Sequence, residues 1–327
     1  MLNSISIIIV NYNGAQYLKN TISSCVNMFR HNGFDDFELL ILDNASTDNS
    51  VDVIHDVLGG LPFVETTFIK SKVNHGFAKG CNILSKIAKR EILYFLNNDT
   101  MSLDASEFIG LIRAGDFKDN SVWAFKTLNS DGTRQNNVFR YPTRSKFLVE
   151  MVLLKNKLHF LLKKMRFSTF KDNYDSSYFS GCALLISKNV FLQLNGFDEE
   201  FYFYHEECDL FIRLEQKFKK KLDKKLLNDE IIHYGGGGGI ISDFSFVAYY
   251  TNLYRLYLKH GIISQRSLNF IFKFNFLIKK ILYLMNIQYE YSPFAKTYKI
   301  SGSERNPVEV YELQMKLMDN IKREFNK

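Results

Sequence analysis

The strongest fold signal in the sequence lies near its start, in the stretch Ile5-Ser6-Ile7-Ile8-Ile9-Val10-Asn11-Tyr12-Asn13-Gly14. A mostly β-branched, apolar run is followed there directly by polar residues and a glycine. A run this short and this continuously apolar is typical of a strand buried on both faces, as in a parallel sheet. Two more runs have the same form, because Phe37–Leu42 precedes polar residues 43–48 and Ile92–Leu96 precedes polar residues 97–100. The sequence therefore predicts three parallel strands with polar ends.

Helical sequence separates these strands. Stretches with the apolar spacing of helices occupy Gln16–Phe29, Ser50–Leu58 and Ala78–Ala88. Strand and helix thus alternate, which predicts an α/β fold with right-handed crossovers. Two further strands are predicted over Tyr178–Ser187 and Leu226–His233.

The composition is that of an ordinary globular protein. Of the 327 residues, 46% are hydrophobic and 24% are charged, which excludes wholesale disorder. Lys and Arg exceed Asp and Glu by 42 − 35 = 7, and this surplus favours an anionic partner such as nucleic acid, a phosphorylated substrate or an acidic membrane face. The four cysteines form no CxxC pair, which argues against zinc-ribbon, thioredoxin-type and disulfide-scaffold proteins. The first residues lack the basic segment of a signal peptide, so a cytosolic protein is expected.

Two basic regions follow the α/β pattern. The lysines between Lys217 and Lys225 are predicted to form the solvated face of a helix. The chain after residue 242 is predicted to be helical, and Leu268–Tyr289 is apolar but interrupted by lysines. A spanning helix needs about 20 mostly apolar residues, so this segment is predicted to be either an interfacial helix or a helix packed on the first domain. We expect an α/β domain over residues 1–240 and a helical region over residues 241–327.

The polar strand ends are the first candidate site. In open α/β sheets, ligands bind beyond the carboxyl ends of the strands. One such cluster alone is equally consistent with a turn or a helix cap, whereas three clusters at one edge favour a site. Asp99 follows the third strand beside Asn97 and Asn98. Oxygen ligands of this type suit Mg²⁺ or Mn²⁺, which would neutralise charge on a diphosphate leaving group.

A second acidic cluster contains Glu206, Glu207 and Asp209, near a predicted helix start. Acidic residues at that position interact well with the helix dipole, so a structural role is open. Aromatic residues at 201–204 precede the cluster, and burial with like-charge crowding would raise the pKa of a carboxyl group toward that of a general base. Arg213, one or two turns further on, could keep one of the acids ionised.

Several common nucleotide and hydrolase motifs are absent from the sequence. No G-x-G-x-x-G follows the first predicted strand, and no G-x-x-x-x-G-K-[ST] occurs. H-E-x-x-H and G-x-S-x-G are also absent. A Rossmann dinucleotide site, a P-loop, a zincin site and an α/β-hydrolase site are therefore not favoured.

Taken together, the two acidic clusters lie within a pattern that resembles family 2 glycosyltransferases of the GT-A fold, in particular the rhamnosyltransferase-like branch of bacterial polysaccharide synthesis. The resemblance covers about residues 4–260 and depends on six segments in the family's order. These segments are Ile8–Gly14, Leu42–Asp48, Asn74–Asn82, Leu96–Thr100, Ser180–Ala183 and Gly196–Arg213. It implies a Rossmann-like mixed, mainly parallel sheet flanked by helices, with residues 1–240 as the catalytic domain.

The resemblance also implies roles for individual residues. In the family, the end of the first strand and the Asp43 position hold the base and ribose of a nucleotide-sugar donor, and the loop from Asn74 to Asn82 closes over it. The residues implied in nucleotide-sugar binding are Asn11, Tyr12, Asn13, Asp43, Asn74, Gly76, Asn82, Asn98 and Asp99. Tyr12 is expected to stack on the base.

For the metal and the catalytic base, the resemblance points to three positions. Asp99 occupies the last position of the D-x-D-like motif, with asparagines in place of the two earlier acids, and is expected to bind Mn²⁺ or Mg²⁺. His233 corresponds to a late histidine that can complete the metal or diphosphate site. Glu207 corresponds to the base, although the family usually has an aspartate there, so Glu206 or Asp209 could serve instead.

The expected function is inverting transfer of a sugar from a nucleotide-sugar donor, dTDP-rhamnose or a UDP-hexose, to a hydroxyl of a glycan acceptor. The acceptor is expected to be lipid-linked, in O-antigen or capsule synthesis, with the protein peripheral at the inner face of the cell membrane. The alternative is a sugar-phosphate nucleotidyltransferase, which uses a similar sheet but a Gly-rich, basic signature that residues 11–14 do not match. No pattern of a nucleic-acid-binding module is present, so no nucleic-acid partner is expected.

Overall fold

The computed structural model describes residues 3–145, 174, 176–235 and 243–284, together with Asp319 and Arg323. Contacts divide the chain into two compact units. The first comprises Met1–Arg140, Tyr174–Tyr202 and Glu206–Gly236, and the second comprises Tyr141–Asn173, Phe203–His205 and Gly237–Lys327. The expected division at residue 240 stays a prediction, because residues 236–242 lie outside the described part of the chain.

The first unit is built on a sheet in which the described strands follow the order β3-β2-β1-β4-β10-β6-β11-β5, with β7 paired to β6. A separate two-stranded sheet pairs β8 with β9. The strands are β1 (Ile5–Asn11), β2 (Phe37–Asp43), β3 (Glu65–Lys70), β4 (Ile92–Leu96), β5 (Thr100–Ser102), β6 (Ser121–Leu128), β7 (Arg134–Gln135), β8 (Val138–Arg140), β9 (Ser177–Phe179), β10 (Ala183–Ser187) and β11 (Asp223–His233).

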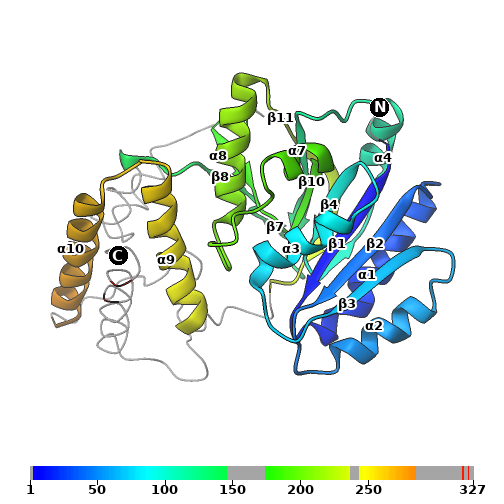
Figure 1. Cartoon of the computed structure of the whole chain (residues 1–327), viewed down its shortest axis with the longest axis horizontal. Coiled ribbons are helices and arrows are strands. Elements are labelled where there is room, and N and C mark those ends of the chain that lie inside the picture. Colours follow the sequence, from blue (N-terminus) through cyan, green and yellow to red (C-terminus); the bar gives the residue numbers. More distant parts are fainter. Residues whose placement is uncertain are drawn as a thin grey trace. The chain divides into compact units, whose positions relative to one another are not determined.

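Helices connect and cover these strands (Figure 1). In the first unit they are α1 (Ala15–His31), α2 (Ser50–Gly59), α3 (Gly76–Ile87), α4 (Ser106–Arg113), α7 (Lys188–Gln193), α8 (Glu206–Phe218) and the 3₁₀ turn η1 (Lys219–Lys221). The second unit contains α9 (Asp243–Lys259) and α10 (Gln265–Leu284).

The three predicted parallel strands are confirmed. β1 lies between β2 and β4 and is parallel to both, so Asn11 pairs in register with Asp43. Five of the described strands were not predicted from the sequence, namely β3, β5, β6, β7 and β8. β3 lies at the edge of the sheet with mostly exposed or half-exposed residues and has no continuous apolar run. The single strand predicted over residues 178–187 is wrong in one respect, since residues 180–182 interrupt it and β9 and β10 belong to different sheets.

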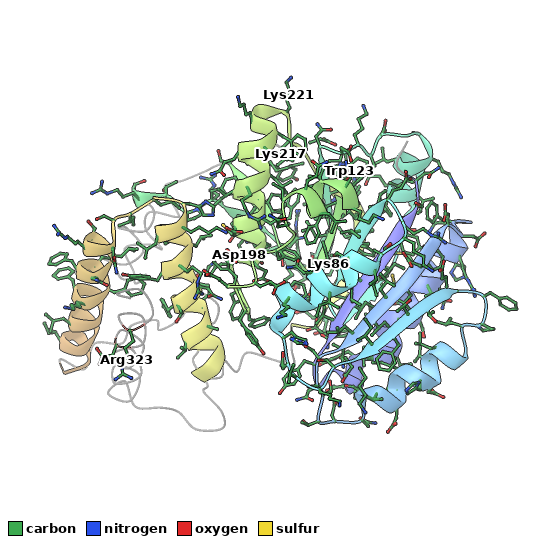
Figure 2. The ribbon with its side chains drawn as sticks, in the orientation of Figure 1. Lys86, Trp123, Asp198, Lys217, Lys221 and Arg323 are labelled. Atoms are coloured by element: carbon green, nitrogen blue, oxygen red, sulfur yellow. The ribbon has the colours of Figure 1, made fainter. Side chains whose placement is uncertain are left out.

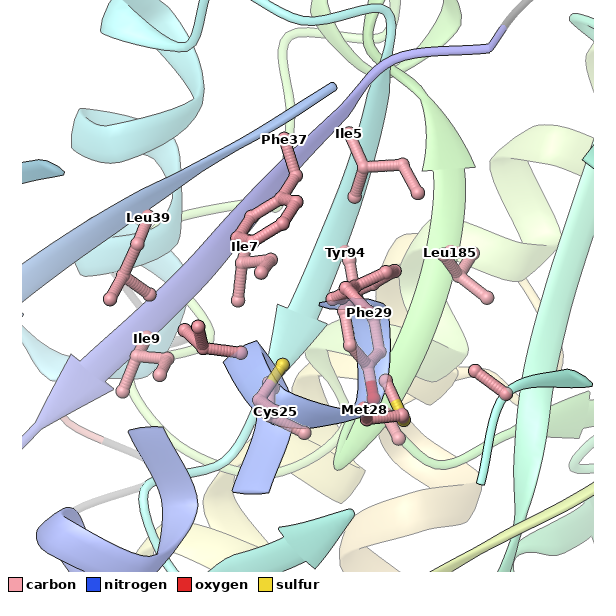
Figure 3. Packing of buried hydrophobic residues seen from close by; sticks show 14 of the residues in the cluster. Ile5, Ile7, Ile9, Cys25, Met28, Phe29, Phe37, Leu39, Tyr94 and Leu185 are labelled. Carbon is pink, nitrogen blue, oxygen red and sulfur yellow. The ribbon is translucent and has the colours of Figure 1, made fainter. Parts of the chain in front are cut away.

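The central strands are buried on both faces, as their unbroken apolar runs predicted. Ile5, Ile7 and Ile9 face a core that they share with residues of α1, including Phe29 (Figure 3). On the opposite face α3 approaches β1 so closely that a Cβ added to Gly80 would lie 2.8 Å from Val10 Cγ1. A helix thus covers each face of β1. The carboxyl end of the strand is the part that these helices leave accessible to a ligand.

The basic run between residues 217 and 225 is only partly a solvated helix face. Lys217 and Lys221 lie at the end of α8 and in η1, exposed to solvent (Figure 2). Lys224 and Lys225 belong instead to β11. The Lys224 Nζ lies 2.6 Å from Glu215 Oε1 with a side chain only 4% exposed, and Lys225 Nζ lies 4.8 Å from the centre of the Trp123 ring. The chain turns into a strand at residue 223, and this turns the last two lysines inward.

The second unit contains two packed helices among its described residues. Phe272 of α10 contacts Tyr254 and Tyr250 of α9, with ring centroids 5.9 and 6.2 Å apart. The Tyr254 hydroxyl donates a hydrogen bond to Asn269 Oδ1 at 2.9 Å. Among the described helices, none has the length and apolar character needed to cross a bilayer. The predicted segment Leu268–Tyr289 lies within α10 as far as residue 284, and its remaining residues are outside the described part.

Candidate active site

The ends of β1, β2 and β4 meet through one buried amide. Asn11 Nδ2 donates to Asp43 Oδ1 at 2.9 Å and to Ser46 Oγ at 3.1 Å, and Asn98 Nδ2 donates to Asn11 Oδ1 at 2.7 Å. Asn11 and Asp43 are both fully buried. The polar residues that follow β1, β2 and β4 are far apart in sequence, yet they form one hydrogen-bonded network at the end of the sheet. We call this network of Asn11, Asp43, Ser46 and Asn98 the floor of the site. Gly14 is needed beside it, since an added Cβ would lie 2.2 Å from Asn98 Nδ2.

The two residues after Asn11 lie on the surface of this floor. Tyr12 is 50% exposed, and the Asn13 side chain is also exposed. Asn13 adopts a left-handed φ of 51°, which asparagine tolerates better than most residues. Its Oδ1 accepts a hydrogen bond from the Thr47 backbone N–H at 2.7 Å, which ties the turn after β1 to the turn after β2.

The loop from Asn74 to Gly76 is fixed from two sides. Asn74 Oδ1 accepts hydrogen bonds from Asn44 Nδ2 at 2.8 Å and from the Gly76 backbone N–H at 2.9 Å. Gly76 has a φ of 78°, and a Cβ there would lie 2.5 Å from the Tyr202 carbonyl oxygen, so only glycine fits. The same carbonyl accepts the Phe77 N–H at 3.1 Å. This loop joins the end of β2 to the segment that precedes α8.

Asn82 and Asp209 both stabilise the segment from Leu194 to Phe197, Asn82 directly and Asp209 through Arg213. Asn82 Nδ2 donates to the Phe197 carbonyl at 2.8 Å, and Asn82 Oδ1 accepts the Phe197 N–H at 2.9 Å. Asp209 is fully buried, and its Oδ2 lies 2.7 Å from Arg213 Nε. Arg213 also donates to the carbonyls of Leu194 and Gly196. Both residues thus have a structural role. The role of Asn82 in donor binding and the role of Asp209 as the base stay predictions.

The structure brings Asp99 and His233 together at the end of the sheet. Asp99 Oδ1 lies 3.3 Å from His233 Nε2, and β11 is paired with β5, which follows Asp99 directly. Gln135 completes the arrangement because His233 Nδ1 lies 2.8 Å from Gln135 Oε1, an acceptor only. The Nδ1 atom therefore carries the proton, and Nε2 lies 3.3 Å from both Asp99 Oδ1 and Asn97 Nδ2. Sequence reasoning missed Gln135, which lies in a two-residue strand with no distinctive pattern.

Glu206 and Glu207 begin α8, as predicted. Tyr204 and His205 precede them with left-handed φ values of 73° and 70°, a conformation that is uncommon for residues other than glycine and turns the chain sharply into the helix. Glu206 is 6% exposed, and one oxygen of each carboxyl, Oε2, is buried without a donor among the described residues. The two carboxyl groups are close enough that the charge of Glu207 raises the pKa of Glu206.

The pKa values of both carboxyl groups are raised. Burial, and then the charge of Glu207, raise the pKa of Glu206 well above 4.5. Burial also raises the pKa of Glu207. Both shifts move these carboxyl groups toward the pKa range of a general base.

The segment Gly181-Cys182 connects the two acidic groups. The Gly181 backbone N–H lowers the pKa of Glu207, while the Cys182 carbonyl accepts the Asn97 N–H at 2.9 Å. Burial raises the pKa of the Cys182 thiol, and the charges of both Asp99 and Glu207 raise it further. Both carboxylates therefore lie within electrostatic reach of one buried side chain. The sequence pattern included these residues but gave them no role.

Comparison with known proteins places this geometry in a class. A mannosyltransferase from Pyrobaculum calidifontis, PcManGT, solved with GDP-Man and Mn²⁺, matches 99% of this chain and 87% of its own with a TM-score of 0.54 at 11% identity. GalNAc-T7, solved with UDP, GalNAc and Mn²⁺, matches 71% of this chain and 43% of its own with a TM-score of 0.51 at 14% identity. The predicted fold is confirmed: this is the GT-A fold of glycosyltransferases.

The family follows from the sequence comparison. The model of glycosyl transferase family 2 matches residues 6–193, more than half of the chain, and the chain belongs to that family. An uncharacterized glycosyltransferase of Haemophilus influenzae is 33% identical over 95 residues, which are 29% of this chain and 36% of that protein. The low-salt glycan biosynthesis hexosyltransferase Agl10 of Haloferax volcanii is 26% identical over 226 residues, 65% of this chain and 62% of that protein. The chain therefore matches less than two thirds of the length of either relative. The rhamnosyltransferase-like branch stays a prediction.

Proposed function

We propose that this protein is an inverting glycosyltransferase that moves a sugar from a nucleotide-sugar donor to a hydroxyl of a glycan acceptor. One observation carries the proposal: Asp99 lies 3.3 Å from His233 at the end of the sheet, and Asp99 and Glu207 are both near enough to the buried Cys182 thiol for their charges to raise its pKa. An acid beside a basic nitrogen and a second acid that can accept a proton are the two functions that displacement of a nucleotide requires.

Glu207 is the proposed catalytic base. The acceptor hydroxyl attacks the anomeric carbon from the face opposite the nucleotide and transfers its proton to the Glu207 carboxylate. Burial and the charge of Glu207 raise the pKa of Glu206, and we propose that Glu206 stays protonated beside an ionised Glu207. Asp209 is less suited to this role because its carboxylate is fully buried and paired with Arg213.

Asp99 and His233 are the proposed metal ligands. A carboxylate oxygen and an imidazole nitrogen whose ring is fixed by Gln135 fit Mn²⁺ or Mg²⁺ as a donor set, with Asn97 Nδ2 giving up its contact with Nε2 when the ion binds. The described residues contain no group of three or more His, Cys, Asp and Glu side chains that could enclose an ion, so donor phosphate oxygens and water would supply the remaining ligands. When bound, the ion would neutralise charge on the departing diphosphate. Mn²⁺ accompanies a nucleotide or nucleotide sugar in both structures compared above.

For the nucleotide-sugar donor, we propose one group of buried residues that shapes the site and another group of exposed residues that contacts the donor. Asn11 and Asp43 are fully buried and bonded to each other, so we expect them to position the floor under the nucleotide. Tyr12 and Asn13 are exposed there and are available to stack on the base and to contact the ribose. The other donor-binding positions are Asn74, Gly76, Asn82, Asn98 and Asp99. The proposed donors are dTDP-rhamnose and the UDP-hexoses.

For the acceptor, we propose a glycan on a lipid carrier at the inner face of the cell membrane, in synthesis of a cell-surface polysaccharide such as an O-antigen or a capsule. The names of two relatives support glycan synthesis in general. Agl10 acts in glycan biosynthesis, and the chondroitin synthase of Pasteurella multocida is 29% identical over 160 residues, 45% of this chain and 15% of that protein. A peripheral membrane position would bring the enzyme to such an acceptor.

The test replaces Glu207 by glutamine, which has the same shape but cannot accept a proton. A thermal-shift screen of UDP-, GDP- and dTDP-sugars, with and without Mn²⁺, first identifies the donor. Glu207→Gln is expected to retain donor affinity and to lose about 10²–10⁴-fold in turnover. Glu200→Gln, at an exposed glutamate nearby, is the matched control and should transfer normally. Near-normal turnover by Glu207→Gln would refute the role of Glu207. Release of pyrophosphate from a nucleoside triphosphate and a sugar 1-phosphate would favour the nucleotidyltransferase alternative.

A further inference from the structure

Helix α10 of the second unit carries a row of large apolar side chains that are exposed to solvent. Phe270 is 69% exposed, Phe274 39%, Leu277 50% and Ile281 47%. Their spacing of four, three and four residues places them on one face of the helix. The rings of Phe270 and Phe274 stack with their centroids 6.0 Å apart, so the row is continuous at its start. These four residues are called the α10 stripe.

The α10 stripe is distinct from the face that holds α10 in the fold. Leu268 and Phe272 are fully buried and Ile271 is 6% exposed, and these residues lie on the side that packs against α9. The helix thus has two apolar faces, one packed and one exposed. Contiguous exposed apolar surface on a folded protein usually marks a contact with a partner or a membrane.

The charges on α10 indicate the chemistry of that partner. The helix contains Arg266, Lys273, Lys279 and Lys280 and no acidic residue. The Arg266 and Lys273 side chains are exposed. Arg266 lies one turn before Phe270, and Lys273 directly precedes Phe274, so positive charge borders the stripe. Apolar side chains bordered by basic ones on one helix face are typical of helices that lie in the interface of an anionic bilayer.

We propose that the α10 stripe binds the surface of an anionic lipid bilayer, with α10 parallel to the membrane plane. Phe270, Phe274, Leu277 and Ile281 enter the boundary between headgroups and acyl chains, while Arg266 and Lys273 contact lipid phosphates. A second copy of the chain is a poorer partner, because it would bring the same positive charges against each other. The inference depends on the proposed peripheral membrane position and not on the transfer chemistry.

The first test removes the apolar contacts. The full-length protein is sedimented with vesicles of phosphatidylcholine alone and with vesicles containing one quarter phosphatidylglycerol. We expect binding to the anionic vesicles only, and at least about a tenfold loss of that binding in Phe270→Ser/Leu277→Ser. Both side chains are exposed, so the double variant should fold, which circular dichroism checks. Phe63→Ser is the matched control, because Phe63 is 88% exposed on the first unit. Equal vesicle binding by wild type and the stripe variant would overturn the proposal.

The second test reverses the charges. Arg266→Glu/Lys273→Glu is expected to lose at least about tenfold in binding to anionic vesicles, whereas Lys86→Glu/Lys118→Glu, at exposed lysines of the first unit, should bind as the wild type does. Binding by the wild type should also fall as salt is raised from 0.1 to about 0.5 M. Equal loss in both charge-reversed variants would show that only net charge matters and would overturn the assignment to α10.

Two further outcomes separate the competing explanations. Sedimentation velocity measures the oligomeric state, and a wild-type dimer that the stripe variant dissociates without losing vesicle binding would make the stripe an interface between copies, against the proposal. Transfer to a soluble acceptor tests the chemistry independently. A wild-type protein that binds anionic vesicles through the stripe but transfers no sugar would support this inference and refute the proposed function.

Discussion

Replacing Glu206 by glutamine tests the acid pair through the stability of the protein. Glu206 is 6% exposed, and burial followed by the charge of Glu207 raises its pKa well above 4.5. Glutamine has the same shape, can still donate a hydrogen bond to Glu207 and has no proton to lose. The difference between the two proteins therefore isolates the cost of ionising a buried carboxyl group.

The sign and size of the effect follow from linkage. A carboxyl group whose pKa is higher in the folded state than in the unfolded state holds its proton more tightly when folded. The contribution of Glu206 to the free energy of unfolding is therefore greatest below pH 4.5 and falls as the pH rises toward the folded-state pKa of this group. The fall is about 1.4 kcal/mol per pH unit in that window. Between pH 5.5 and 6.5 the wild type should lose about 1.4 kcal/mol relative to Glu206→Gln, or about 3–6 °C in Tm.

The assay is urea unfolding followed by the fluorescence of Trp123, the single tryptophan, which is buried in the same unit as Glu206. Wild type, Glu206→Gln and the exposed control Glu200→Gln are compared at pH 5.5 and 6.5. As the pH rises, the free energy of unfolding of Glu206→Gln should increase relative to that of the wild type. The difference between Glu200→Gln and the wild type should not change with pH. A difference between Glu206→Gln and wild type that does not change with pH would refute the raised pKa of Glu206.

Three more outcomes are expected. Asp99→Ala should abolish the Mn²⁺-dependent part of donor affinity, since His233 alone is a weak site; calorimetry with and without Mn²⁺ measures this, and an unchanged Mn²⁺ effect would count against the metal site. Arg213→Met should destabilise the fold by about 3–5 kcal/mol, because it leaves the buried Asp209 carboxylate without its cation, and urea unfolding that shows a loss below about 1 kcal/mol would contradict this. Because burial raises the pKa of Glu207, kcat/KM should rise with pH through an acid limb that lies above pH 4.5; a profile already flat at pH 5 would argue against Glu207 as the base.

The sequence predicted those parts of the fold that depend on local pattern. β1, β2 and β4 have unbroken apolar runs because helices cover both of their faces, and such runs are visible without any partner. β3 has no such run, because one of its edges has no neighbour in the described sheet and most of its side chains meet solvent. The break between β9 and β10 was hidden because the glycine turn at residues 180–182 lies within a mostly apolar stretch.

Fewer of the contacts in the candidate site could be predicted from local sequence patterns. Strand ends of a parallel sheet must meet at one edge, so the contact of Asn11 with Asp43 and Asn98 could be predicted from order alone. The approach of Asp99 to His233 depends on the pairing of β5 with β11, which joins distant parts of the chain, and only the family resemblance suggested it. The Gln135 contact had no signal in the sequence, since a single polar residue in a short strand fits any exposed turn.

The interruption between β9 and β10 has a consequence for how such an enzyme can change. Gly181 and Cys182 are adjacent residues, one linked to Glu207 and the other to Asn97. Consecutive Cα atoms are held about 3.8 Å apart by covalent geometry. The contact partner of Glu207 and the contact partner of Asn97 therefore cannot move apart. We expect this segment to stay unchanged while the exposed loops around it vary.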